Sequence, residues 1–184
     1  MTTRRPANRG PGAAVENRLA LVAAAAEVFA EQGIDAPLNA VAKRAGVGQG
    51  VLYRHFPDRV SLALAAFGTN VAEIEALAAE PGCGVDDLCA ALTRQMIDSV
   101  AFVDLVTSAD RDPRLEAIHD RVRTALVGAV DRARQEQVLR PAVDVDDVML
   151  AVGMIASLVA KVPETERRTT AEAAWSLLDR GLRP

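Results

Sequence analysis

The chain has 184 residues, of which half are hydrophobic, a quarter are charged and only 3% are aromatic. This composition is typical of a globular protein and excludes a fibrous or disordered chain. The net charge of −4 argues against a uniformly basic nucleic-acid binder. The charge is unevenly divided, however: residues 1–60 carry eight Lys and Arg against five Asp and Glu (+3), and residues 61–184 carry thirteen against twenty (−7). This asymmetry suggests a basic working module on an acidic body.

The N-terminal stretch of residues 1–14 combines three arginines with two prolines and two glycines and has no apolar periodicity. It is expected to be a disordered tail, either simply solvated or acting as a basic arm that reaches DNA. Apolar residues then recur at helical spacing over about 15–32, and Gly33 ends that helix. The apolar run 19–26 could pass for a signal-peptide core, but Glu16 and Glu27 flank it on a helical period. A cytoplasmic protein without a membrane span is therefore expected.

The rest of the chain also has helical patterns, separated by clear breaks. Two short helices are expected at about 38–45 and 48–55, around the break Gly46-Val47. Longer helices are expected at about 58–79, 85–107 with an interruption near Ala101, 113–137, 144–162 and 167–181. No convincing strand or internal repeat occurs in the sequence. The predicted fold is all-α, with about nine helices.

The segment 41–56, VAKRAGVGQGVLYRHF, is typical of a helix-turn-helix. That motif needs two short helices that meet at a sharp angle, with a small residue in the turn. Ala42 is small enough for the helices to cross closely, and Gly46 can adopt the positive φ of the turn. The residues spaced to face one core are Val41, Val47, Leu52 and Phe56.

The other side chains of the second short helix have chemistry that suits DNA. Gln49 can form a bidentate contact with an adenine edge, and the methyl groups of Val51 can contact thymine. Gly50 adds no bulk, so the backbone can approach the groove. Contacts to phosphates, which set the register without reading sequence, are expected from Tyr53, Arg54, His55 and Arg59.

The long first helix, the Ala-Gly-Val turn and the Leu-Tyr-Arg-His-Phe string followed by Arg59 resemble the DNA-binding domain of the TetR family over residues 15–65. The resemblance implies a sequence-specific transcriptional regulator that binds double-stranded DNA. It implies base contacts from Gln49, Gly50, Val51 and Asn39, and phosphate contacts from Tyr53, His55 and Arg59. Further candidates on the two short helices are Lys43, Arg44, Gly48 and Arg54.

The motif departs from the family pattern at both helix starts. Members usually cap these helices with Ser or Thr, whereas Pro37-Leu38 opens the first helix here and Gly48 opens the second. A glycine cap costs only a few tenths of a kcal/mol relative to a hydroxyl residue. The departure removes a hydroxyl contact to phosphate and leaves the motif itself intact.

The family resemblance also implies an organisation for the rest of the chain. A helix-turn-helix domain at 15–65 would follow the 1–14 tail, and residues 66–184 would form an effector-binding and dimerisation domain. The helices over about 58–137 would surround a cavity for an unknown small-molecule effector, with the candidate lining Phe67, Val71, Met96, Val100, Phe102, Val103, Ile118 and His119. The last two helices would form a homodimer interface with the candidates Val152, Ile155, Ala156, Val159, Trp175 and Leu178.

Other kinds of site have weak support in the sequence. Cys83 and Cys89 are expected to be reduced thiols, and the two histidines lie too far from them in sequence to suggest a zinc site. No nucleophile-and-base pattern is present, so no catalytic residue and no cofactor are predicted. The resemblance to the TetR family implies a two-fold dimer on an inverted-repeat operator, acting as a repressor that an effector releases. The alternative is a DNA-binding protein without such an effector, acting architecturally or through a protein partner.

Overall fold

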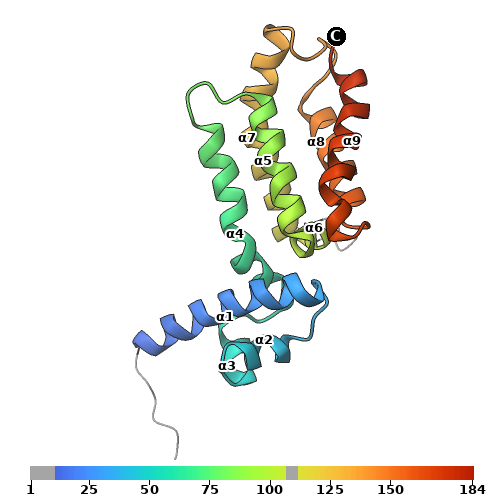
Figure 1. Cartoon of the computed structure of the whole chain (residues 1–184). Helices are drawn as coiled ribbons and strands as arrows, with labels where there is room; N and C mark the ends of the chain where they lie inside the picture. The colour runs from blue at the N-terminus through green and yellow to red at the C-terminus, as the bar shows by residue number, and fades with distance from the viewer. Residues whose placement is uncertain (1–10, 107–111) are drawn as a thin grey trace, which may run out of the picture. The chain divides into compact units, whose positions relative to one another are not determined.

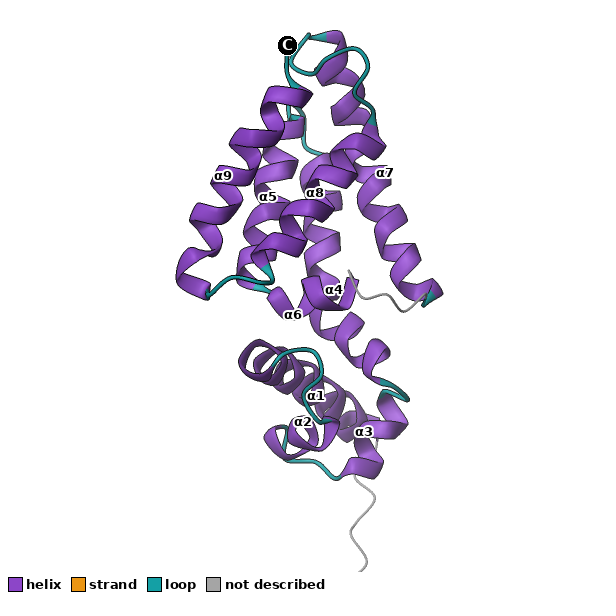
Figure 2. Ribbon diagram, turned by 90° about the vertical axis from the view of Figure 1, so that its right-hand side faces the viewer, coloured by secondary structure: helices purple, strands orange, loops and turns teal. Residues whose placement is uncertain are grey.

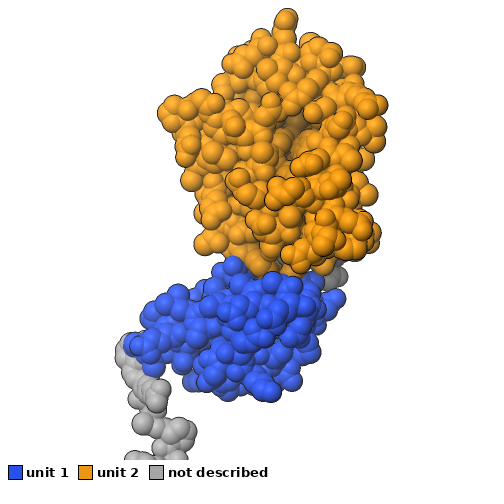
Figure 3. Space-filling model, in the orientation of Figure 1, with its two compact units in different colours: residues 1–66 blue, residues 67–184 orange. Residues whose placement is uncertain are grey.

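The computed structural model describes residues 11–106 and 112–184, and these residues form nine α-helices and no strand. The all-α prediction is confirmed (Figures 1 and 2). The chain divides into two compact units, residues 1–66 and 67–184, coloured separately in Figure 3. A tail is predicted over residues 1–14, and residues 1–10 of it lie outside the described part of the chain. Residues 11–14 belong to the first helix, which begins at Pro11.

The first unit holds three helices and the start of a fourth. They are α1 (Pro11–Gln32), α2 (Leu38–Arg44), α3 (Gln49–His55) and the first residues of α4 (Arg59–Ala78). The three complete helices pack on one another in pairs. Their shared core contains fully buried side chains from each of them, including Leu21, Phe29, Val41 and Leu52, together with Phe56, which directly follows α3. Removing such apolar surface from water is the main force that holds these short helices together.

The second unit contains the rest of α4 and five further helices. These are α5 (Val85–Asp98), α6 (Val100–Val106), α7 (Pro113–Gln135), α8 (Val145–Val159) and α9 (Glu164–Leu182). Helix α5 packs against α7, α8 and α9, and α8 packs against α7 and α9 (Figure 2). The fully buried Leu88, Leu126, Ile155 and Val159 lie in the core that these helices share.

Local sequence signals explain where several of these helices begin. The Asp112 carboxylate accepts a hydrogen bond from the backbone N–H of Arg114 (2.9 Å), and Pro113 fills the first turn of α7. Asp144 caps α8 by accepting from Asp146 N (2.9 Å) and Asp147 N (3.1 Å), and the Asp147 carboxylate accepts from Asp144 N in return.

The structure corrects three predicted helix boundaries. The interruption expected near Ala101 falls at Ser99, whose φ of −140° and ψ of 71° separate α5 from α6. Helix α8 ends at Val159, three residues before the predicted end, and α9 begins at Glu164, before the predicted start. Because helix ends depend on a few hydrogen bonds, periodicity places them only approximately.

Helix α4 is the one described helix that is long and apolar enough, by length and composition, to cross a membrane. Its apolar residues nevertheless include Leu62, Val71 and Ile74, which are buried within the protein. The Glu75 carboxylate on the same helix forms a two-point ion pair with Arg121 of α7, at 2.7 Å for each hydrogen bond. Both features are those of a helix that packs against protein.

Candidate nucleic-acid interface

Helices α2 and α3 meet through a tight turn of the backbone. The Ala45 N–H donates to Val41 O (2.9 Å) and the Val47 N–H donates to Ala42 O (3.0 Å), so the last carbonyls of α2 are satisfied inside the turn. Gly46 takes a φ of +68°, which is strained for any residue with a side chain. The turn therefore has the geometry that the spacing in the sequence predicts.

One face of this helix pair is committed to the core of the first unit. Val41, Leu52 and Phe56 are almost completely buried, and Val47 is half-buried. The Arg18 guanidinium of α1 lies 4.5 Å from the centre of the Phe56 ring, a cation–π contact that no local spacing in the sequence could indicate. These contacts fix the orientation of α3 on α1 and α2.

The opposite face of the pair carries the predicted DNA-facing residues. Exposed positions on it are Asn39, Lys43, Gly48, Gln49, Gly50, Tyr53 and Arg54, and half-buried ones are Val51 and His55. Tyr53 is 51% exposed, which is unusual for a large aromatic side chain. In the described part of the chain, no hydrogen bond or ion pair engages the side chains of Gln49, Tyr53 or Lys43. These groups are thus available to a partner.

Two glycines, Gly48 and Gly50, leave this face without protruding side chains on either side of Gln49. A Cβ placed on Gly48 or Gly50 would meet no atom within 4 Å. Gly48 has a φ of −75° and a ψ of 151°, the extended conformation of a residue that precedes a helix. Neither position requires a glycine, so both leave open space next to Gln49, where a DNA groove could approach the backbone closely.

Arg44 lies within the predicted interface but is held by its own molecule. Its guanidinium donates to Glu27 (3.0 Å) and to both carboxylate oxygens of Glu31 (3.1 and 2.7 Å) on α1. The hydrogen bond from Arg44 holds the pKa of the Glu31 carboxyl below its usual range. This arrangement joins α2 to α1 and makes Arg44 a positioning residue for the motif.

Arg59 is also turned towards its own molecule. The sequence predicts a phosphate contact for it, but one guanidinium nitrogen donates to the carbonyls of Ile34 and Ala36, the latter at 2.6 Å. Those carbonyls lie in the loop between α1 and α2. Among the described residues, Arg59 is the side chain that donates to them. Arg59 is half-buried and joins the first turn of α4 to that loop. Sequence reasoning misses this role because the partners are backbone atoms more than twenty residues away.

The second unit contains a largely apolar cavity of about 150 Å³ between α5, α6, α7 and α8. Its lining is Leu92, Gln95, Met96, Val103, Leu115, Ile118, His119, Val122, Met149, Val152, Gly153 and Ala156. Four of the eight predicted lining residues are in this set, namely Met96, Val103, Ile118 and His119. Phe67, Val71 and Val100 are not among them, and the side chain of Phe102 lies outside what the structure describes.

The residues predicted for a dimer interface do not share an exposed face, and this is a correction. Val152, Ile155, Ala156 and Val159 are at most 7% exposed and lie in the core of the unit. Trp175 and Leu178 are half-buried and pack against that core. The solvent-exposed large apolar side chains of the last two helices are instead Leu150, Met154, Leu158 and Leu177, which are 48–65% exposed. Since α8 is apolar on almost every side, its sequence does not indicate which face is buried.

An exposed face on a helix-turn-helix, followed by a separate helical unit, is the architecture of a DNA-binding regulator. Residues 21–66 match the family model described as bacterial regulatory proteins of the tetR family. A TetR transcriptional regulator from Streptomyces coelicolor, SCO0520, has a solved structure that is 31% identical, with a TM-score of 0.58 over 91% of this chain and 98% of that one. The chain belongs to the TetR family of DNA-binding transcriptional regulators.

Two further comparisons agree with this assignment. The regulator SrpR of Pseudomonas putida is 33% identical over 71% of this chain and 62% of its own length. TtgW of the same species is 34% identical over 47% of this chain and 65% of its own length. The matches thus span less than two thirds of these curated relatives. The structure of the TetR-family protein CprB from S. coelicolor shares the fold, with a TM-score of 0.67 at 22% identity over 93% of this chain and 90% of that one.

Proposed function

We propose that the chain is a cytoplasmic, homodimeric repressor that a small apolar effector releases from an inverted-repeat operator. The proposal that an effector binds is supported by the cavity between α5, α6, α7 and α8. A fully packed core at that place would favour the alternative of a DNA-binding protein without an effector, acting architecturally or through a protein partner. A cavity with a few polar groups in an apolar lining is the usual form of a small-molecule site.

The proposed DNA contacts use the exposed face of α2 and α3. Gln49 and Val51 would read base edges in the major groove, with Gly50 allowing a close approach. Tyr53, Arg54, His55 and Lys43 would bind phosphates and set the position of the helix, with Asn39 at the edge of the contact. Gln49 and Tyr53 are the strongest members of this set, because both are exposed and neither is engaged within the protein.

The proposed dimer uses the exposed apolar row on α8 together with α9. Leu150, Met154 and Leu158 are spaced by four residues, so they form one stripe along α8. Leu177 adds an exposed side chain from α9. Two copies of these helices would bury the stripe in a two-fold four-helix contact. The dimer would present two α3 helices to successive major grooves, about 34–36 Å apart.

The proposed release couples the cavity to α4 through Gln95. This side chain lines the cavity and donates a hydrogen bond to Asn70 O of α4 at 2.9 Å. The ion pair between Arg121 and Glu75 ties α4 to α7 as well. An effector that changes the position of Gln95 would therefore act on α4, which continues into the DNA-binding unit. The coupling free energy equals the difference in effector affinity between the DNA-bound and released states.

The test is a titration of a fluorescent duplex taken from upstream of the gene for this protein, at fixed salt. The double variant Gln49→Ala, Tyr53→Ala should lose tight binding, whereas Gln135→Ala, an exposed glutamine at the end of α7, should bind like the wild type. Equal binding by all three proteins would refute the proposed contacts. Val122→Phe, which places a ring in the cavity, should bind DNA normally and no longer respond to a releasing compound. A response that survives this change would refute the cavity as the effector site.

A further inference from the structure

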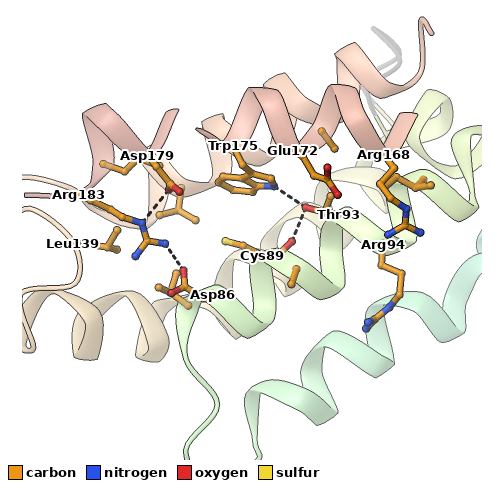
Figure 4. A pocket seen from close by; sticks show the side chains of 16 residues that line it. Asp86, Cys89, Thr93, Arg94, Leu139, Arg168, Glu172, Trp175, Asp179 and Arg183 are labelled. Carbon is orange, nitrogen blue, oxygen red and sulfur yellow. Dashed lines mark hydrogen bonds and ion pairs between the residues drawn. The ribbon is translucent and has the colours of Figure 1, made fainter. Parts of the chain in front are cut away.

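A second hollow lies in the same unit, on another side of α5. It is a groove of about 410 Å³ between α5 and α9 (Figure 4). Among its lining residues are Cys89, Ala90 and Thr93 of α5 and Arg168, Trp175 and Leu182 of α9. We call it the α5–α9 groove. It shares no lining residue with the cavity between α5 and α8, so the two can be filled and altered independently.

The indole of Trp175 forms a fixed wall of this groove. Its ring N–H donates to the Thr93 hydroxyl oxygen at 2.8 Å, and that hydroxyl donates to Cys89 O at 2.7 Å (Figure 4). The polar edge of the ring is therefore satisfied within the protein, while the side chain remains only half-buried. A flat apolar surface held in one orientation suits the apolar body of a ligand.

The floor of the groove is apolar and chemically inert. Leu139, Val148 and Ala171 line it and are buried in the core of the unit. Burial raises the pKa of the Cys89 thiol to about 12. This thiol therefore stays protonated at neutral pH and packs as a small apolar group, without nucleophilic character. The groove is a place for noncovalent binding.

Among the described residues, the charged groups form ion pairs at one end of the groove and not at the other. At one end Arg183 pairs with both Asp86 (2.5 Å) and Asp179 (3.1 Å), so two carboxylates share one guanidinium group there (Figure 4). At the other end Arg94 and Arg168 are exposed, and no described residue forms an ion pair with either. Glu172 is the remaining carboxylate of the lining. This second end thus has two guanidinium groups against one carboxylate, and its local charge is positive.

We propose that the α5–α9 groove binds an amphipathic carboxylic acid, with its apolar body along Trp175 and its carboxylate at Arg168 and Arg94. The planar guanidinium group is the side chain best suited to hold a carboxylate by two parallel hydrogen bonds. The volume of the groove lies in the range of small-molecule sites. The positive excess at the end of the groove with Arg94 and Arg168 favours an acid over a neutral or cationic molecule of the same shape.

The groove stays accessible in the proposed dimer. Trp175 and Leu177 are two residues apart on α9, which turns their side chains about 200° from each other around the helix axis. The half-buried Trp175 faces α5, and Leu177, 65% exposed, faces away from it. Ligand binding in the groove and subunit contact through Leu177 therefore use different faces of α9.

Binding is measured directly, with decanoate as the probe. Trp175 is the only tryptophan of the chain, so tryptophan fluorescence reports this groove alone. Decanoate does not absorb in the range used, and decanamide and decylammonium have the same chain with a neutral or positive head. Decanoate should change the emission in a saturable way, decanamide more weakly and decylammonium least. Equal responses to all three, or no response to decanoate, would overturn the proposal.

Matched variants assign the response to the groove, with calorimetry as a second readout. Arg168→Ala should weaken decanoate binding roughly fivefold to tenfold, because the variant lacks an exposed charged hydrogen bond to the ligand. Arg180→Ala, an exposed arginine of α9 outside the groove, should leave it unchanged. Ala90→Phe should block the groove, and Val122→Phe should not affect binding because it fills the other cavity. Binding that resists Ala90→Phe, or that disappears in Val122→Phe, would place the acid elsewhere and overturn the proposal.

Discussion

Replacing Arg59 with alanine separates a structural role of this guanidinium group from a role in binding DNA. In the structure it donates to Ile34 O and Ala36 O, and the backbone near these carbonyls is half-buried to buried. A hydrogen bond that involves a charged group contributes about 1.5–3 kcal/mol. Because Arg59 is only half-buried, values near the lower limit apply, and removing both bonds should cost about 2–3 kcal/mol. For a chain of this length the melting temperature should fall by roughly 4–12 °C.

The same variant is then compared with Arg54→Ala for binding to a duplex of arbitrary sequence at several salt concentrations. Arg54 is exposed, and its one hydrogen bond, to Gly50 O at 3.2 Å, lies within α3. We expect the free energy of unfolding of Arg54→Ala to lie within about 0.5 kcal/mol of the wild-type value. The slope of its salt dependence should fall by about 0.9 for each phosphate that the variant no longer neutralises. Arg59→Ala should show the reverse pattern. A wild-type melting curve for Arg59→Ala, together with a reduced salt slope, would refute the structural role.

Three further outcomes are expected. Leu150→Glu combined with Met154→Glu should make the protein monomeric in sedimentation velocity, while Val127→Glu on α7 should not; a dimeric double variant would refute the proposed interface. Arg114 and the backbone N–H of α7 lower the pKa of Asp112 to about 2 from an ordinary 3.8, so its stabilisation is present above pH 3.8 and is lost as the pH falls towards 2. Asp112→Asn should therefore lose less stability than the wild type between pH 5 and pH 2.5 in urea unfolding, and equal losses would contradict this. Since burial raises the pKa of Cys89 to about 12, iodoacetamide at pH 8 should label it far more slowly in the folded protein than in urea, as followed by mass spectrometry; equal rates would show an accessible thiolate.

The features that the sequence predicts correctly are those set by neighbouring residues. The turn at Gly46 and the starts of α7 at Asp112 and of α8 at Asp144 depend on residues within three or four positions. Each combines a residue type with a local hydrogen bond, and such combinations are visible in a single sequence. The burial of Leu52 and Phe56 likewise follows from their spacing on a short helix with one apolar side.

The features that the sequence does not predict depend on distant parts of the chain. The residues that hold Arg59 and Arg44 lie in another helix or loop. The α5–α9 groove arises only because the fold brings Trp175 next to Thr93, which is 82 positions earlier. The burial of the residues predicted for the dimer face has a different reason: α8 has apolar residues on nearly all sides, so periodicity identifies a helix without identifying its buried face.

The open space at Gly48 and Gly50 has a consequence for how this regulator can diverge. Neither backbone has a positive φ, and a new Cβ at either position meets nothing within 4 Å. A Cβ can therefore be added beside Gln49 without meeting the folded core, and Gly48→Ser would also supply the hydroxyl cap that members of the family usually have. In the proposed interface, a substitution at either glycine would therefore change the surface next to Gln49 with little effect on the folded core. After a gene duplication, a single substitution at either glycine could redirect one copy to a new operator while both copies continue to fold.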